Sequence, residues 1–405
     1  MRSPVTKRFY RRHRLIVFLM ASLCLVLVNI SGVYIHPFEL DFGTNFSYPL
    51  DLENFRDIIE GLKEMNFNTD SDVKDRQTLQ QTLPLPQHIN DYNYRFIIRN
   101  ENKCSKRWSS STSSKSVIIT SFSNTDDEII TRNLDDITLL IVVKSSLTHF
   151  KARDVIRKSW GFEKRFSDVT IKTVFILGNC VDRRDVYNCQ DSIDEEMDAN
   201  KDIVQADFVD SYYNNTIKTM MAFKWSVHYC SSAQFILFVD DDYYVSVKNL
   251  LKYIRNPLNT WPTIDTNSIN IVPNTPFDGR LYTGYVFTTS SPMRHKTSKW
   301  FVSLEDYPYS RYPPYVTAGA YVLSNASLIE MYYASLYTKH FPFDDIYVGI
   351  LAKKLSITAI HNENFHFWPF GYSVDTYNDV IAAHGFSDPN QLIRVWNQQK
   401  SLGFA

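Results

Sequence analysis

The sequence predicts an α/β protein with a mainly parallel central sheet, because apolar strand-like runs alternate with segments of helical periodicity. In chain order these segments are ITLLIVV (137–143), KARDVIRKSWG (151–161), VTIKTVFILG (169–178), DIVQADF (202–208), NTIKTMMAFKWSVHYC (215–230) and QFILFV (234–239). The last of them leads directly into three consecutive aspartates. Since ligands collect at the carboxyl ends of strands in open α/β sheets, a functional site is expected there.

Composition is that of a globular protein. The chain has 405 residues, 44% of them hydrophobic and 15% aromatic, which is enough for one large domain or two smaller ones. Lysine and arginine together number 43 against 44 acidic residues, for a net charge of -1. Without an overall basic field, nucleic acid is not an expected partner.

The N-terminus pairs positive charge with a long apolar run. The basic residues are Arg2, Lys7, Arg8, Arg11, Arg12 and Arg14. Residues 15–35 then carry no charge, which predicts a retained transmembrane signal-anchor, with residues 1–14 cytoplasmic and the body on the far side. A cleaved signal peptide is the alternative, but its apolar region is shorter and no small-x-small cleavage site precedes Glu39.

Residues 36–115 are predicted to be a stem or linker, because they contain LPLPQ and the serine-rich SSSTSSKS with little periodicity. A small packed subdomain is the alternative, since the apolar patch from Tyr92 to Ile98 has the character of a strand. The main folded body is then expected at 116–405.

Cysteines and acceptor sequons agree with an oxidising, lumenal environment. Cys104, Cys180, Cys189 and Cys230 follow the predicted span and allow three pairings, which the sequence leaves open. No zinc-type spacing is present. Glycosylation sequons begin at Asn45, Asn214 and Asn325.

The stretch FILFVDDDYYV at 235–245 places three carboxylates at the end of a buried strand. Residues i and i+2 of extended backbone point to one side, so Asp240 and Asp242 are expected to face a shared ligand. Two ionised carboxylates at close range favour a cation, and hard oxygen donors suit Mn²⁺ or Mg²⁺, which bind diphosphates. An acidic surface turn, a structural calcium site and chance are the competing interpretations.

Two further motifs carry charge. Arg153 and Arg157 are four residues apart and share one helix face, where guanidinium groups suit phosphate, although such a pair is often only a solvated face. Asp344 and Asp345 form a second acidic pair before the helical IYVGILAKKL. Asp344 is expected to cap that helix.

Several ordered blocks resemble one family, the inverting Golgi glycosyltransferases that form β-1,3 linkages from UDP-sugars, which includes β-1,3-galactosyl- and β-1,3-N-acetylglucosaminyltransferases. The blocks are ARDVIRKSWG (152–161), FILG (175–178), DIVQADFVDSYYNNTIKT (202–219), FVDDDYYV (238–245), YPPYVTAGAYVLS (312–324), FDDIYVG (343–349) and AHGFSDPNQLIRVW (383–396). The resemblance implies a GT-A-like nucleotide-sugar-binding domain behind a single N-terminal transmembrane helix and stem.

The resemblance also assigns roles to residues of this chain. It implies that Asp242 and His384 bind Mn²⁺ (or Mg²⁺), and that Asp345 is the catalytic base. The residues implied to bind the donor are Arg153, Arg157, Glu196, Lys218, Asp240 and Asp241.

The expected activity is transfer of galactose, N-acetylglucosamine or N-acetylgalactosamine from a UDP-sugar to a hydroxyl of a glycan acceptor on a glycolipid or glycoprotein. The expected linkage is β-1,3, and the reaction is expected to be inverting and manganese-dependent. The protein is expected in the Golgi membrane, as a single-pass type II glycoprotein. The alternatives are an inactive lumenal binding or chaperone relative and a DxD phosphotransferase with Asp240 as nucleophile. The sequence departs from the family pattern at Ala152, Val316, Tyr243 and Tyr244, and in the reduced glycine cluster AGAY around Gly319.

Overall fold

The computed structural model describes residues 4–47, 59, 88–105, 116–119, 130–133, 137–180, 186–255 and 279–405. It divides into two compact units. The smaller unit is Met1–Tyr48 with Thr288–Pro313, and the larger unit is Pro49–Phe287 with Pro314–Ala405. The larger unit contains the central sheet and every residue that the sequence assigned to catalysis, donor binding or metal binding.

In the smaller unit, helix α1 (Pro4–Ser31) is followed by a 3-10 helix, η1 (Val33–Phe38), and the short helix α2 (Phe42–Asn45). Arg294 is buried within this unit, where its Nε lies 2.7 Å from Glu39 Oε1. Its other N–H groups donate to backbone carbonyls of Val302, Ser303, Tyr307 and Tyr309. The guanidinium therefore organises the 288–313 segment around itself.

The predicted transmembrane helix at 15–35 is wrong. Among the residues that the structure describes, no helix combines the length and the apolar character needed to cross a bilayer. Helix α1 starts at Pro4, so five basic residues share it with the apolar run. The run is also interrupted at Gly32, whose φ of 70° ends α1, and residues 33–35 belong to η1.

The larger unit is built on an eight-stranded sheet with the order β1-β6-β5-β4-β7-β10-β9-β11. Its strands are β1 (Phe96–Ile98), β4 (Ile137–Lys144), β5 (Thr170–Asn179), β6 (Ile203–Val209), β7 (Phe235–Asp240), β9 (Tyr282–Phe287), β10 (Tyr315–Ser324) and β11 (Ile360–His361). Strands β6, β5, β4 and β7 are parallel neighbours, whereas β10 is antiparallel to both β7 and β9. The predicted α/β class agrees with this sheet.

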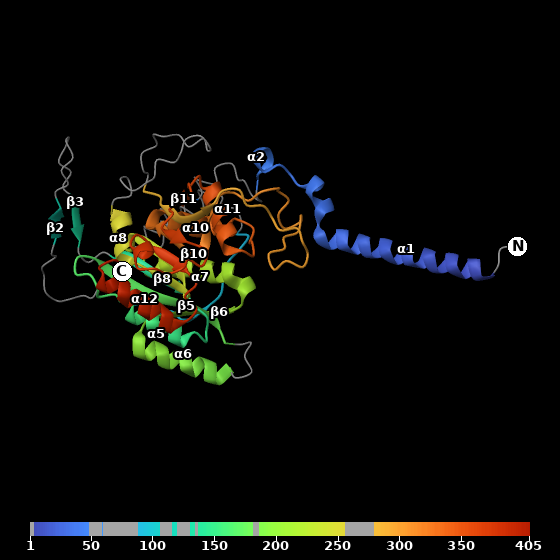
Figure 1. Ribbon diagram of the computed structural model, residues 1–405. Helices are drawn as coiled ribbons and strands as arrows, with labels where there is room; N and C mark the ends of the chain where they lie inside the picture. Colours follow the sequence, from blue (N-terminus) through green and yellow to red (C-terminus); the bar gives the residue numbers. More distant parts are fainter. Residues whose placement is uncertain are drawn as a thin grey trace. The chain divides into compact units, whose positions relative to one another are not determined.

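Buried strands explain why the centre of the sheet is parallel. In β4 nearly every side chain is buried, because helices cover both faces of the sheet. Leu139, Ile141 and Val143 point to one face and pack in a core cluster with Ile156 of α5 (Phe150–Lys158) and Trp396 of α12 (Pro389–Ser401). Helices α7 (Asn215–Tyr229), α10 (Asn325–Leu336) and α11 (Asp344–Lys354) contact one another in a separate group (Figure 1).

These helices are α5 (Phe150–Lys158), α6 (Val186–Asn200), α7 (Asn215–Tyr229), α8 (Val247–Arg255), α10 (Asn325–Leu336), α11 (Asp344–Lys354) and α12 (Pro389–Ser401), with 3-10 turns η2 (Tyr212–Asn214) and η3 (Asp375–Tyr377). A serine and an aspartate are the N-cap residues of α10 and α12. Ser324 accepts a hydrogen bond from Ser327 N at the start of α10, and Asp388 accepts one from Asn390 N at the start of α12.

A three-stranded sheet with the order β12-β13-β8 connects the acidic triplet to the C-terminal part of the chain. Its strands are β12 (Phe365–His366), β13 (Ala382–His384) and β8 (Tyr243–Val245). A further pair of strands, β2 (Ser116–Ile119) and β3 (Ile130–Asn133), is antiparallel. The small sheet matters for function because β8 directly follows the triplet and β13 ends at His384.

Much of the predicted stem, 36–115, lies outside the described residues, so its extent stays a prediction. Within it, Phe96–Ile98 forms strand β1, which pairs with β6 at the edge of the central sheet. Lys224 Nζ also donates to Tyr92 O at 3.0 Å. This apolar patch is therefore part of the larger unit and packs on its central sheet.

Two disulfides select one of the three pairings that the sequence allowed. Cys104 is bonded to Cys230 at the end of α7, and Cys180 to Cys189 in α6. The sequon residues lie at element boundaries: Asn45 ends α2, Asn214 ends η2 and Asn325 begins α10. Their glycosylation stays a prediction.

Candidate active site

The carboxyl ends of β4 and β7 place Lys144 beside Asp240, because these two residues are partners in the parallel register. Lys144 Nζ lies 3.2 Å from Asp240 Oδ1 and 3.0 Å from Asp344 Oδ2, and it donates to Ala318 O at 3.0 Å. Its side chain is 6% exposed. Lys144 therefore joins the two acidic motifs, the triplet and the pair at 344–345, into one site.

Lys144 was not among the residues selected from the sequence. The available signal was a lysine at the end of the otherwise apolar strand ITLLIVVK. A charge in that position must find a partner when the strand is buried, and the partners here are carboxylates.

Asp240 therefore has a counter-ion in the protein. Burial raises the pKa of Asp240 to about 7, while the Lys144 charge opposes that rise. The Asp240 side chain keeps 38% of its surface exposed, so solvent moderates the effect of burial. The expectation that Asp240 and Asp242 share one ligand is only partly reproduced, since each has its own partner.

Asp241, the middle residue of the triplet, points back to the β4–α5 loop. Its Oδ2 accepts hydrogen bonds from Ser145 Oγ at 2.6 Å and is 2.9 Å from His149 Nδ1. The hydrogen bond to Asp241 raises the pKa of His149, whose side chain is 52% exposed. An imidazole with this partner carries more positive charge at neutral pH than a free histidine, which suits a phosphate ligand.

Asp242 and His384 meet across the small sheet. Antiparallel pairing of β8 with β13 sets His384 opposite Tyr243, and His384 Nε2 lies 3.2 Å from Asp242 Oδ2. The two side chains are about equally exposed, at 36% and 33%. The hydrogen bond to Asp242 raises the pKa of His384.

The donor set of this pair fits a divalent cation. A carboxylate oxygen and an imidazole nitrogen are both ligands that Mn²⁺ accepts, and their exposure leaves coordination positions for phosphate and water. Among the described residues no group of three or more histidines, cysteines or acids has metal-binding geometry. A cation held here would thus depend on its nucleotide ligand as well as on the protein.

The second acidic pair begins helix α11, and its two carboxylates have different environments. Asp344 is buried and accepts hydrogen bonds from Lys144 Nζ at 3.0 Å and Thr219 Oγ1 at 2.7 Å. Burial alone would raise the pKa of Asp344, but the Lys144 charge and these hydrogen bonds hold it below its usual range. The predicted capping role of Asp344 is wrong, because Phe343 is the N-cap residue.

Asp345 has the opposite electrostatic environment. Burial, followed by the negative charge of Asp344, raises the pKa of Asp345 to about 7. Its Oδ1 accepts a hydrogen bond from Ile346 N at 2.8 Å. A carboxylate that takes up a proton near neutral pH has the basicity that general base catalysis requires.

Comparison with known proteins identifies the family. A sequence model of the family described as Galactosyltransferase matches residues 151–363, just over half of the chain. The chain belongs to this family and is a glycosyltransferase.

Individual relatives agree with this assignment. Beta-1,3-galactosyltransferase brn of Drosophila melanogaster is 42% identical over 269 residues, which are 66% of this chain and 76% of that protein. Beta-1,3-galactosyltransferase 1 of Mus musculus is 32% identical over 316 residues, 77% of this chain and 81% of that protein. Beta-1,3-galactosyltransferase bre-5 of Caenorhabditis elegans is 36% identical over 252 residues, 62% of this chain and 71% of that protein.

A solved glycosyltransferase involved in glycosylation of the major capsid of PBCV-1 superposes with a TM-score of only 0.30. Its sequence identity is 12%, covering 64% of this chain and 99% of that chain. An overlap this low adds nothing to the assignment.

In this glycosyltransferase Arg153 is fully buried, and its five N–H groups all have partners. Nε and Nη2 donate to the carboxylate of Glu196, at distances from 2.7 to 3.1 Å. Nη1 donates to Ser145 Oγ and Ser146 O, and Nη2 also donates to Leu147 O. Arg153 thereby fixes the loop that contacts Asp241, and the predicted direct contact with the donor stays a prediction.

Arg157 shares Glu196 with Arg153. Its Nη2 lies 2.7 Å from Glu196 Oε1, and its Nε lies 2.7 Å from Asp202 Oδ2. The guanidinium also stacks on the Phe175 ring, 4.7 Å from the centroid. The structure brings Arg153, Arg157 and Glu196 together as one ion-pair network, whose contribution to donor binding is untested.

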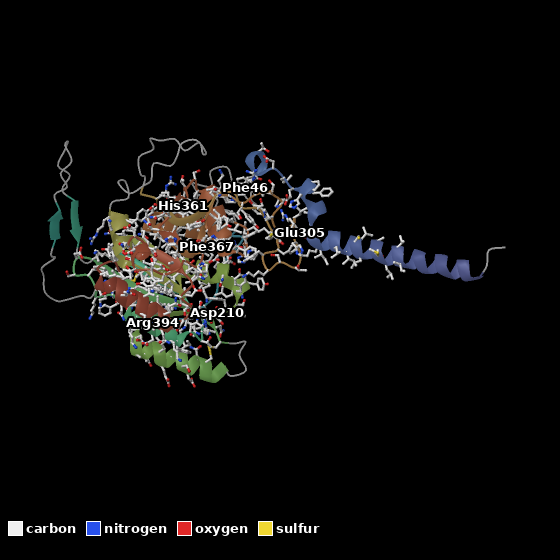
Figure 2. All side chains as sticks on the ribbon, in the orientation of Figure 1. Phe46, Asp210, Glu305, His361, Phe367 and Arg394 are labelled. Carbon is white, nitrogen blue, oxygen red and sulfur yellow. A yellow bond between two sulfur atoms is a disulfide. The ribbon has the colours of Figure 1, made fainter. Side chains whose placement is uncertain are left out.

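Lys218 reaches the same loop from helix α7. Its Nζ lies 2.7 Å from Asp210 Oδ1 and donates to Ser145 O at 2.8 Å. Asp210, which is labelled in Figure 2, in turn accepts a hydrogen bond from Gly178 N at 3.0 Å. The ends of β4, β5 and β6 are thus connected through one lysine and one aspartate.

Two of the departures from the family pattern compensate each other. A Cβ atom on Gly319 would lie 2.0 Å from the Tyr243 hydroxyl, so the tyrosine ring occupies the space beside β10 that glycine leaves. The Tyr243 ring also lies 5.1 Å from the ring of His384. Tyr243 therefore forms one wall beside the Asp242–His384 pair.

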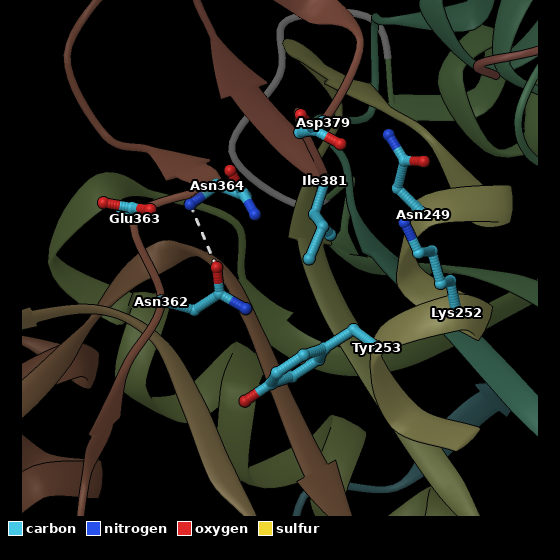
Figure 3. A pocket seen from close by; sticks show the side chains of 8 residues that line it. All are labelled: Asn249, Lys252, Tyr253, Asn362, Glu363, Asn364, Asp379 and Ile381. Atoms are coloured by element: carbon cyan, nitrogen blue, oxygen red, sulfur yellow. Dashed lines mark hydrogen bonds between the residues drawn. The ribbon is translucent and has the colours of Figure 1, made fainter. Parts of the chain in front are cut away.

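A polar pocket of about 180 Å³ lies at the opposite end of β13 from His384. Figure 3 shows its lining, in which side chains of α8 face the turn before β12. The residues are Asn249, Lys252, Tyr253, Asn362, Glu363, Asn364, Asp379 and Ile381. None of the residues predicted to act in catalysis lines it.

Proposed function

We propose that this glycosyltransferase moves galactose from UDP-galactose to a hydroxyl of a glycan acceptor, forming a β-1,3 linkage with inversion at the anomeric carbon. The names of its relatives support the sugar and the linkage. The observation that carries the proposal is the Lys144 bridge, which unites Asp240 of the triplet with Asp344 beside Asp345.

In this mechanism Asp345 is the catalytic base. Its carboxylate takes the proton of the acceptor hydroxyl while that oxygen forms a bond to the anomeric carbon. The bond between this carbon and the UDP oxygen breaks, and its electron pair leaves with UDP. Asp344 keeps its negative charge through Lys144 and Thr219, which maintains the basicity of Asp345.

Asp242 and His384 are the residues that would hold Mn²⁺ or Mg²⁺ in this proposal. A divalent cation supplies positive charge that stabilises the departing diphosphate. His149, which contacts Asp241, and Lys218, which donates to Ser145 O, would add positive charge on the donor side in this proposal. We also propose a lumenal compartment of the secretory pathway, which two disulfides support.

The test is UDP release by the purified protein from UDP-galactose, UDP-N-acetylglucosamine or UDP-N-acetylgalactosamine. Acceptors are methyl glycosides and disaccharides ending in galactose, glucose, mannose or N-acetylglucosamine. Asp242→Asn should weaken UDP binding and its enhancement by Mn²⁺ in calorimetry. Asp154→Asn is the matched control, because this aspartate is exposed and paired only with Lys158 among the described contacts.

Faster turnover of UDP-galactose than of the other donors, with a β-1,3 product by NMR, is the expected result. Preference for another donor would contradict the sugar assignment but keep the site. Folded protein that binds UDP without turnover on any acceptor would favour an inactive relative.

A further inference from the structure

An aromatic cluster that is partly exposed to solvent lies next to the site and has no role in the mechanism above. It consists of Tyr285 and Phe287 of β9 with Phe367 and Trp368, which follow β12; we call these four residues the aromatic platform. The Phe287 and Phe367 rings are 5.5 Å apart, Tyr285 lies 6.1 Å from Phe367, and Phe367 lies 4.7 Å from Trp368. Trp368 is 64% exposed.

One end of the platform adjoins the predicted metal ligand. Strands β12 and β13 are parallel, with Phe365 opposite Ala382 and His366 opposite Ala383. Phe367 and His384 are the residues that directly follow the last pair of this ladder, His366 and Ala383. Figure 2 shows Phe367 and His361 on this part of the larger unit.

The other end adjoins the helix that carries the predicted base. The Phe287 ring lies 5.6 Å from that of Tyr315 in β10. Helix α11 packs so closely on Tyr315 that a Cβ on Gly349 would lie 2.4 Å from the Tyr315 Cβ. Gly349 is four residues after Asp345 and therefore on the same face of α11.

We propose that the aromatic platform binds a sugar ring of the acceptor glycan, which rests on the proposed function. Pyranose rings expose C–H groups with partial positive charge on their apolar faces, and these pack on the electron-rich faces of aromatic rings. The nucleotide donor instead needs the charged residues around Asp241 and Asp242. The platform lies between the residues assigned to the leaving group and to the base, where an acceptor must bind.

A solvent-exposed tryptophan on top of half-buried aromatic rings is typical of a contact surface. The occupant inferred here is a saccharide because the platform continues the active site itself. Its aromatic rings are held in place by neighbours, as in the His361 ring 5.1 Å from Tyr285, so little side-chain freedom is lost on binding.

The experiment compares Trp368→Ala and Trp368→Phe with the wild type. The acceptors are the methyl glycoside that wild-type protein uses best and the disaccharide with the same terminal sugar. Trp368→Ala should raise KM for at least one acceptor by about tenfold, which corresponds to about 1.4 kcal/mol, while KM for the UDP-sugar changes less than about twofold. Trp368→Phe should recover most of the loss, since a phenyl ring still stacks.

Phe162→Ala is the control, because Phe162 is 51% exposed and lies outside the platform. Unchanged acceptor KM in a folded Trp368→Ala variant would overturn the inference. A loss confined to lipid-linked acceptors, with soluble saccharides unaffected, would also overturn it in favour of a lipid contact. A wild-type protein without any transfer would instead refute the proposed function, so the two failures are distinguishable.

Discussion

Replacing Lys144 by methionine is expected to destabilise the protein by about 3 to 5 kcal/mol at about pH 8, the usual result of removing one member of a buried ion pair. Methionine retains most of the aliphatic volume, so the loss is mainly electrostatic. Asp344 has an 8% exposed side chain and would keep only the Thr219 hydroxyl and local backbone as described donors. The Asp240 side chain is 38% exposed, so water would solvate its carboxylate in place of the lysine.

The loss of stability in Lys144→Met should depend on pH. In the wild type the lowered pKa of Asp344 stabilises the fold above the pKa of the unfolded chain, and this stabilisation is lost as pH falls through the folded value. In Lys144→Met the buried carboxyl takes up a proton more readily, since a neutral acid needs no counter-ion. The difference between variant and wild type should therefore shrink towards about pH 5.

Urea denaturation at the two pH values measures both effects. Lys158→Met is the matched control, because Lys158 pairs with Asp154 at 2.6 Å while both side chains are more than half exposed. Its cost should stay below about 0.5 kcal/mol. Adding Asp344→Asn to Lys144→Met should restore part of the stability. A Lys144→Met cost below about 1 kcal/mol, or one independent of pH, would refute this reasoning.

Three further outcomes are expected. Asp345→Asn should lower transfer by about 10² to 10⁴-fold with little change in UDP affinity. Because the pKa of Asp345 is raised to about 7, wild-type turnover should increase with pH through this value, and persistence of the same inflection in the variant would exclude Asp345 as its source. Gly319→Ala should lower the melting temperature, because the new methyl group would clash with Tyr243. Adding Tyr243→Ala to this variant should reverse part of the loss. A wild-type melting temperature in the single variant would contradict this packing. Replacing Cys104 and Cys230 with serine should lower the free energy of unfolding by about 5 kcal/mol, and replacing Cys180 and Cys189 by about 3 kcal/mol, as measured by guanidinium titration. The first effect is larger because the first disulfide closes the longer loop. The reverse order would show that chain entropy does not dominate.

The sequence predicted the parallel centre of the sheet because those strands are buried on both faces and appear as continuous apolar runs. Edge and antiparallel strands were harder. Phe96–Ile98 is three residues long and gains its structure from pairing with β6, and β10 joins the sheet through contacts with β7 and β9. At the N-terminus, Gly32 adopts a left-handed conformation inside the uncharged run, so α1 ends at Ser31 rather than at residue 35.

In the site, too, some features could be predicted from the sequence and others could not. The position of the triplet after β7 follows from the apolar run before it. The partner of each carboxylate does not follow, because Lys144 and Asp344 are 200 residues apart, and Asp242 and His384 are 142 apart. Periodicity describes which side of a strand a residue occupies, whereas charge compensation depends on which strands become neighbours. The resemblance to a family supplied His384, and only the structure supplied Lys144.

The contacts of Lys144 have a consequence for synthesis of the chain. Its amine is satisfied by Ala318 and Asp344, which emerge 174 and 200 residues later. Until they arrive, β4 cannot bury its terminal ammonium with all of its final partners. A polypeptide truncated before residue 315 would lack β10 and α11, and Lys144 would keep only Asp240 among its described carboxylate partners. The complete site, including Asp345 and His384, therefore forms only near completion of translation.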